Sequence, residues 1–204
     1  KYYDTLPWRS DTHLKRCMDE FPVLRILRQP PGETLLGFLC SATKQIVQIK
    51  EMLNLLRVRF GTELPSGHKA LPSWNQLLQV EEISLRGCKF GFRAANICKT
   101  AKLLGKSENL LHSTIALPYE EAKQTLCTLP GIGEKIADCV LLFGYNRLEA
   151  FPVDTWILKV MKRDYDLKDW SAKQIAQFGR QHFGFHAGLA QQFLFARERK
   201  HALK

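Results

Sequence analysis

Apolar residues recur at helical spacing along most of the chain, and no segment shows the strict alternation of a β-strand. Between residues 33 and 60 the apolar positions that recur at this spacing are Leu35, Leu36, Leu39, Ile46, Ile49, Leu53 and Leu56. Residues 40–45 interrupt this pattern, and two interpretations stay open for them, a loop or the start of a second helix.

The same spacing predicts further helices at residues 73–80, 81–85, 94–104, 119–128, 134–143, 155–163, 171–183 and 188–200. Pro30-Pro31 predicts a stop after the N-terminal segment, and Gly105 predicts the end of the helix that precedes it. Ser171 is a suitable N-cap for the helix that follows it. Glycine and proline at residues 61–72, and glycine with aromatic residues at 87–93, predict loops. The expected fold class is all-α.

The composition adds a strong positive charge to this picture. The chain has 204 residues with a net charge of +10 and a pI of about 9.4. An excess of this size favours an anionic partner, with nucleic acid first and a membrane surface second. No stretch approaches the ~18 apolar residues of a membrane span, and the N-terminus has no apolar signal core. We therefore expect a globular protein that does not cross a membrane.

The six cysteines are scattered and form no Cys-x-x-Cys pair. This spacing argues against a zinc site. Cysteines isolated within apolar runs are typical of a reduced, intracellular protein.

The most informative stretch is residues 126–159, with Leu-Pro-Gly-Ile-Gly at 129–133. Pro130 fixes its φ angle, and Gly131 and Gly133 permit positive φ, so the backbone can turn sharply between two predicted helices. The N–H groups at the start of the second helix lack helical partners and point the same way. Together with the helix dipole they suit a phosphate.

Two residues in this stretch can carry chemistry. Lys135 follows the hairpin directly and shares a helical face with Cys139. A lysine amine held there can act as a nucleophile and form a Schiff base with a sugar C1′, although it can also be a plain phosphate contact. Asp154 stands where the next helix begins; it can stabilise a cationic sugar, serve as an N-cap, or do both.

These motifs carry a family resemblance. Leu-Pro-Gly-Ile-Gly-Glu-Lys-Ile-Ala-Asp-Cys at 129–139, followed by Phe-Pro-Val-Asp-Thr-Trp at 151–156, resembles the helix-hairpin-helix Gly/Pro…Asp superfamily of DNA glycosylases. Residues 24–30, 38–41, 90–94 and 191–195 are similar to segments of the 8-oxoguanine DNA glycosylases in the same order. The resemblance covers most of the chain, and the family's N-terminal β-rich domain is absent from it.

The resemblance implies a two-lobed fold with the active cleft between the lobes. Residues 33–146 would form a helical barrel with the hairpin motif at 126–144, and residues 1–32 plus 147–204 would form the second lobe. Lys135 would be the nucleophile and Asp154 the catalytic carboxylate. Cys139, Gln191 and Phe195 would contact the extruded base; Gln191 and Phe195 lie four residues apart on one helical face.

The DNA-contacting residues that the resemblance implies depart from the family pattern at four places. Phe92, where the family usually has Tyr, would fill the gap left by the extruded base, and Arg93 would read the base left behind. Gln48 replaces an Arg that reads the opposite cytosine, and Trp156 replaces a phosphate-contacting His of some members. The segment Thr43, Lys44 and Gln45 takes the place of an Asn-rich run that fills the emptied stack.

No cofactor is expected to be required. Some relatives carry a four-cysteine iron–sulfur cluster near the C-terminus, and this chain has no cysteine beyond Cys139. The family also implies that the backbone carbonyls of Cys127, Leu129 and Ile132 can hold a structural cation.

These features predict an 8-oxoguanine-type glycosylase with lyase activity. The expected partner is duplex DNA that contains a damaged purine, bound by a monomer inside the cell, in the nucleus or nucleoid. One alternative is a glycosylase for another damaged or mispaired base. A second, from a different class, is a non-catalytic hairpin module that only binds DNA.

Overall fold

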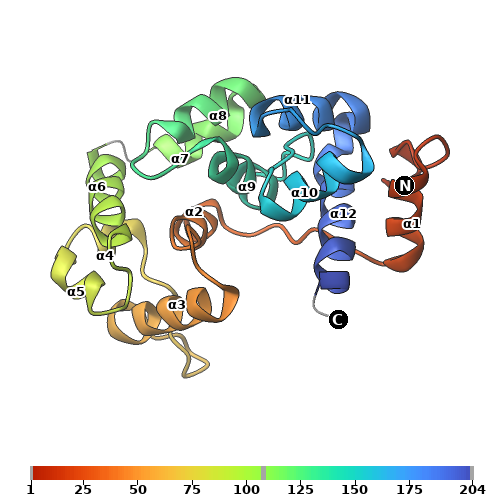
Figure 1. Cartoon of the computed structure of the whole chain (residues 1–204). Coiled ribbons are helices and arrows are strands. Elements are labelled where there is room, and N and C mark those ends of the chain that lie inside the picture. Colours follow the sequence, from red (N-terminus) through yellow and green to blue (C-terminus); the bar gives the residue numbers. More distant parts are fainter. Residues whose placement is uncertain (1, 107–108, 203–204) are drawn as a thin grey trace. The chain divides into compact units, whose positions relative to one another are not determined.

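The computed structural model describes residues 2–106 and 109–202 as helices joined by loops (Figure 1). Within these residues there is no β-strand, and the only strand-like pairing is an isolated bridge between Glu63 and Lys69. The expected all-α class is confirmed. Over the same residues, no helix combines the length and the apolar composition that a membrane crossing requires.

The chain divides into two compact units. The central unit is Gln29–Val140, and the terminal unit combines Lys1–Arg28 with Leu141–Lys204. Both boundaries fall a few residues before the positions expected from the sequence. The second lies inside the helix α9 (Glu134–Gly144), because Leu142 on the last turn of α9 packs closely against Gly188 of the terminal unit.

The helices of the central unit follow the apolar pattern closely. They are α2 (Pro31–Leu39), α3 (Ile46–Phe60), α4 (Trp74–Leu77), α5 (Glu82–Arg86), α6 (Arg93–Lys106), α7 (Leu110–Ser113), α8 (Tyr119–Cys127) and most of α9. Pro31 occupies the first turn of α2, where its missing N–H costs nothing. Residues 40–45 form a loop, which settles the two interpretations left open.

Helix α6 corrects two expectations. It begins at Arg93, which was expected in a loop, and it runs through Gly105 to Lys106. Gly105 is part of the helix, and Leu78 packs closely against it: a Cβ at position 105 would lie 3.0 Å from the Leu78 side chain. The short helix α7 and the 3-10 turn Thr114–Ala116 have no counterpart among the predicted elements.

A compact apolar core holds the central unit together. Met52 and Leu56 of α3 meet Leu85 and Ile97, from α5 and α6, around the fully buried Phe90. Burying a side chain of this size stabilises the fold by about 1.5–3 kcal/mol. This core fixes the position of Phe92, in the loop before α6, and of Arg93, the first residue of α6.

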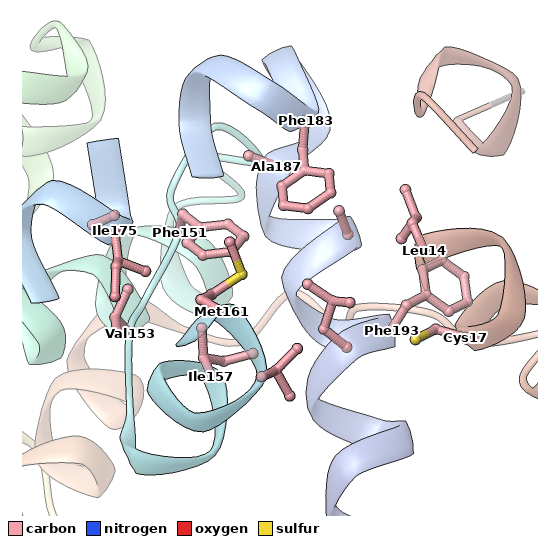
Figure 2. Close-up of a cluster of buried hydrophobic side chains, with 14 of the residues drawn as sticks. Leu14, Cys17, Phe151, Val153, Ile157, Met161, Ile175, Phe183, Ala187 and Phe193 are labelled. Carbon is pink, nitrogen blue, oxygen red and sulfur yellow. The ribbon is translucent and has the colours of Figure 1, made fainter. Parts of the chain in front are cut away.

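The terminal unit is built around one long helix. α12 (Ala187–Ala202) packs against α1 (Thr12–Glu20), α10 (Thr155–Asp164) and α11 (Ala172–Phe183). Figure 2 shows Phe193 of α12, Phe183 of α11 and Met161 of α10 among the buried side chains of this core. The rings of Phe151 and Phe183 are stacked, with centroids 5.6 Å apart.

Side-chain caps set where the helices of the terminal unit begin. Asp11 accepts a hydrogen bond from the N–H of Leu14 at 2.8 Å, and Ser171 accepts one from Gln174 at 3.3 Å. The predicted N-cap at Ser171 is therefore confirmed. Such caps are worth about 0.5–2 kcal/mol each.

Candidate DNA-binding and catalytic site

The hairpin between α8 and α9 has the geometry that its sequence predicts, with one correction. The N–H of Leu129 bonds to the carbonyl of Leu126, and that of Ile132 to the carbonyl of Leu129, both at 3.1 Å. Gly131 adopts φ +82°, whereas Gly133 is not among the residues with positive φ. Only the first glycine therefore provides the left-handed turn; the second lies exposed just before α9.

A buried ion pair braces the two helices of the hairpin. Lys123 of α8 lies 3.0 Å from Asp138 of α9, and the hydroxyl of Tyr119 donates to the same carboxylate. The side chains of Lys123 and Asp138 are 11% and 2% exposed. This cluster was not among the residues predicted from the sequence, although Tyr119 and Lys123 stand four residues apart on one face of α8. Since an unpaired buried charge is costly, the pair fixes α8 against α9.

Lys135 lies on the first turn of α9, half-buried. Its Nζ is 5.6 Å from the centroid of the Phe38 ring, within the range of a cation–π contact. Cys139 follows one turn later and is 4% exposed. The shared helical face that the spacing predicts is thus present, with an amine and a buried thiol one turn apart.

Asp154 is the N-cap of α10. Its Oδ1 accepts the N–H of Ile157 at 2.8 Å, which fixes the orientation of the carboxylate. The three residues before it, 151–153, are buried, so the cap stands on rigid backbone. Trp156 lies on the first turn of α10 and is half-buried. Asp154 belongs to the terminal unit and Lys135 to the central unit.

Gln191 and Phe195 lie one turn apart on α12. The Gln191 side chain is buried, its Nε2 donates to the carbonyl of Pro152 at 3.1 Å, and its Oε1 accepts from Gln192 at 2.7 Å. Phe195 packs against the core of the terminal unit. Both edges of the Gln191 amide are therefore engaged within the protein in this structure.

Phe92 and Arg93 are neighbours with opposite surroundings. Phe92 is 60% exposed, whereas Arg93 is 4% exposed. The Arg93 guanidinium donates from Nη2 to the carbonyl of Ala42 and to Thr43 Oγ1, the latter at 2.7 Å. Its Nε is buried without a hydrogen-bond partner, and burial lowers the pKa of the guanidinium. The two predicted DNA contacts at 43 and 93 are thus joined, with Arg93 turned inward.

The segment from Thr43 to Gln48 carries the other predicted contacts. Thr43 has φ +54°, a conformation that a β-branched residue rarely adopts. Gln45 caps α3, and Gln48 Oε1 accepts the N–H of Gln45 at 3.1 Å. Lys44 is half-buried, and the side chains of Thr43, Gln45 and Gln48 are exposed. These exposed groups lie where a ligand of the central unit can reach them.

The predicted cation site consists of hairpin carbonyls. The carbonyl of Leu129 already accepts the N–H of Ile132, which leaves it a second lone pair. Among the residues that the structure describes, no group of three or more His, Cys, Asp or Glu side chains could hold a metal ion. The carbonyls of Cys127, Leu129 and Ile132 stay a prediction as cation ligands.

The all-α fold and the braced hairpin define a helix-hairpin-helix protein, and comparisons with known proteins identify its family. No protein-family model matches the chain. The chain is similar to the 8-oxoguanine glycosylase/lyase of Clostridium acetobutylicum, whose crystal structure holds double-stranded DNA with cytosine opposite 8-oxoguanine. The two are 35% identical with a TM-score of 0.92, over 99% of this chain and 71% of that one.

Two curated proteins are similar over most of the chain. The "Probable N-glycosylase/DNA lyase" of Methanothermobacter thermautotrophicus is 27% identical over 98% of this chain and 71% of its own length. The N-glycosylase/DNA lyase OGG1 of Arabidopsis thaliana is 33% identical over 85% of this chain, which spans 52% of the plant protein. The chain belongs to the 8-oxoguanine glycosylase/lyase family of helix-hairpin-helix DNA glycosylases.

Proposed function

We propose that this chain is an N-glycosylase/DNA lyase that removes 8-oxoguanine from duplex DNA in base-excision repair. The observation that carries the proposal is the hairpin, which places Lys135 on the first turn of a braced helix, just after the exposed Gly133. The likeness to the Clostridium acetobutylicum enzyme supports the choice of damaged base. The net charge of +10 suits a DNA partner.

In this proposal the hairpin binds one DNA phosphate through the N–H groups that precede α9. The damaged nucleotide leaves the helical stack, and Phe92 fills the space that it vacates. The exposure of Phe92 supports this role, since the ring needs no rearrangement of the core to reach DNA.

The chemistry uses a lysine amine. Lys135 Nζ attacks the sugar C1′, a C–N bond forms, and the bond from C1′ to the base breaks while the base leaves with a proton. The sugar ring then opens: the bond from C1′ to O4′ breaks, O4′ takes the proton that the amine loses, and an imine forms at C1′. The imine makes the neighbouring C2′ proton acidic, and β-elimination then expels the 3′ phosphate. Asp154, held in place as an N-cap, stabilises the positive charge that develops on the sugar.

Gln191 and Phe195, one turn apart on α12, would contact the extruded base. Phe195 offers a ring for stacking, and Gln191 offers a donor and an acceptor for the edge of a purine. Because the Gln191 amide is bonded to Pro152 and Gln192, base binding requires it to exchange these partners. The site is thus proposed to reorganise when the base enters.

The remaining parts of the proposal concern partners. The enzyme acts as a monomer inside the cell, bound to DNA, and requires no cofactor for the chemistry. A cation at the hairpin carbonyls would assist phosphate binding without taking part in bond breaking.

The test is borohydride trapping on a duplex with 8-oxoguanine opposite cytosine. The native protein should form a covalent adduct and release the base, and Lys135→Gln should do neither while still binding the duplex. Lys15→Gln, on the surface of α1, is the matched control and should behave as the native protein. Trapping by Lys135→Gln at the native level would remove Lys135 as the nucleophile.

Two other outcomes separate the alternatives. Adduct formation with other damaged bases and none with 8-oxoguanine would indicate a glycosylase of different specificity. Duplex binding by the native protein without any adduct would indicate a non-catalytic DNA-binding module.

A further inference from the structure

Helix α6 contacts the hairpin through two side chains that lie one turn apart. Asn96 Nδ2 is 2.5 Å from the position that a Cβ on Gly131 would occupy. One turn later, Thr100 Oγ1 donates to the carbonyl of Pro130 at 3.4 Å. All four residues belong to the central unit. One face of α6 therefore lies directly against the turn of the hairpin.

The side-chain amide of Asn96 is available for a further partner. Asn96 is half-buried, and its amide makes no hydrogen bond within residues 2–106 and 109–202. An Asn amide carries two N–H donors. Since the amide packs against Gly131, it stands beside the N–H groups that the hairpin offers to an anion.

The outer face of α6 carries positive charge. Lys99, Lys102 and Lys106 are exposed, and none of them forms an ion pair in the described part of the chain. Lys99 follows Phe92 by seven residues, and Lys106 follows Lys99 by seven. Seven residues are about two helical turns, or ~10.5 Å of rise. The exposed ring of Phe92 and two unpaired cations therefore follow one line along the helix.

We propose that α6 is a second DNA-backbone-binding element beside the hairpin. Asn96 donates to the phosphate that the hairpin N–H groups hold, and Lys99 contacts a neighbouring phosphate. The inference rests on the proposed function as a DNA-binding enzyme and deepens it. It means that one rigid helix sets the spacing between the hairpin and Phe92. This helix begins directly after Phe92 and packs on the hairpin one turn later.

The first experiment measures how the affinity for an 8-oxoguanine duplex depends on salt. A lysine that neutralises a phosphate contributes about 0.9 to the slope of log affinity against log salt. Lys99→Ala should lower that slope by about this amount and weaken binding roughly 3–10-fold at low salt. Lys15→Ala removes the same charge from the surface of α1 and should leave the slope unchanged.

The second experiment separates a hydrogen-bond donor from a packing residue at position 96. Leu and Asp are close to Asn in size. Asn96→Leu should weaken duplex binding about 3–10-fold with the salt slope unchanged, because a neutral donor releases no counterion. Asn96→Asp should weaken binding more than Asn96→Leu, since it places a carboxylate beside a phosphate. A thermal melt of each variant shows whether it is folded.

Equal slopes of log affinity against log salt for Lys99→Ala and Lys15→Ala would remove Lys99 from the interface. Equal affinities for the native protein, Asn96→Leu and Asn96→Asp would reduce Asn96 to packing. If Asn96→Leu fails to fold, Asn96→Asp and the Lys99 series still decide. Native binding that does not weaken with salt would instead contradict the proposed function itself.

Discussion

Phe92 and Arg93 illustrate how two adjacent residues in the chain can be prepared for different tasks. The Phe92 ring lies exposed with the Arg93 Cζ 4.3 Å from its centroid, while the guanidinium itself is held by Ala42 and Thr43. A ring exposed to this extent buries little apolar surface, so it contributes little to folding.

Replacing Phe92 with Ala should therefore leave the melting temperature nearly unchanged. We expect slower release of 8-oxoguanine, because stacking of an aromatic side chain on a base is worth about 1–3 kcal/mol by such substitutions. The measurement is single-turnover base release beside a thermal melt. A large loss of stability in Phe92→Ala would instead place the ring in the core.

Gln48 bears on how well the enzyme would discriminate the base opposite the lesion. Gln offers one donor and one acceptor, so it can satisfy several bases, whereas Arg offers only donors and matches the acceptors of cytosine. The Gln48 side chain is exposed on α3, and its one hydrogen bond among the described residues is to the N–H of Gln45.

We expect a weak preference for cytosine in the native protein and a sharper one in Gln48→Arg, by about 1–3 kcal/mol. Base release from four duplexes, each with a different base opposite 8-oxoguanine, measures both at one salt concentration. A native preference for cytosine near a thousandfold would exceed what Arg93 alone can supply and would contradict this expectation.

Among the helices and turns, the two glycines of the hairpin differ in how strongly the structure requires glycine. A Cβ on Gly131 would combine φ +82° with a contact of 2.5 Å to Asn96, whereas a Cβ on Gly133 would meet nothing within 4 Å. At position 131 the backbone conformation and the contact with Asn96 both exclude a side chain. At position 133 the protein itself leaves room for one.

Gly131→Ala should lower the stability of the central unit by about 1–3 kcal/mol, the cost of a strained backbone position. Gly133→Ala is the matched control and should melt like the native protein. Chemical denaturation of both variants provides the measurement. Equal stability would mean that the turn accommodates a side chain at 131 by moving away from α6.

At the scale of the whole molecule, the excess of positive charge is balanced locally by a few carboxylates in the terminal unit. Glu198 of α12 is 6% exposed and is held by Arg163 and Lys159 of α10. Hydrogen bonds from Arg163 and Lys159 hold the pKa of Glu198 below its usual value, and those from Lys200 and His201 lower the pKa of Glu20 to about 2.

These lowered pKa values predict acid sensitivity. A carboxylate whose folded pKa lies below its unfolded value stabilises the protein fully above about pH 5, and this contribution is lost as the pH falls through the folded pKa. The melting temperature should therefore fall between about pH 5 and pH 2. The free energy of unfolding of Glu198→Gln should start lower than that of the native protein by about 1–3 kcal/mol and should fall less over that range. Parallel curves for both proteins would exclude Glu198 from the effect.

Most of the helices and the chemistry-bearing positions follow from the amino-acid sequence alone. Helical spacing gave the all-α class, Pro130 and Gly131 marked the hairpin turn, and the separation of Lys135 and Cys139 placed both on one face of α9. Each of these features depends on residues close together in the chain, where backbone geometry and periodicity leave few choices. The hairpin was accordingly the most predictable part of the candidate site.

The contacts that hold these side chains in place are visible only in the tertiary structure. The contact of Asn96 with Gly131 and the bond from Gln191 to the carbonyl of Pro152 join residues 35 and 39 positions apart. The hydrogen bond that holds Arg93 inward, to Thr43, joins residues 50 positions apart. Such contacts follow from how whole helices pack on one another, and the polar groups they bury must find partners wherever that packing brings them. No local pattern specifies those partners, so the sequence could name Arg93 and Gln191 as candidates without showing what holds them.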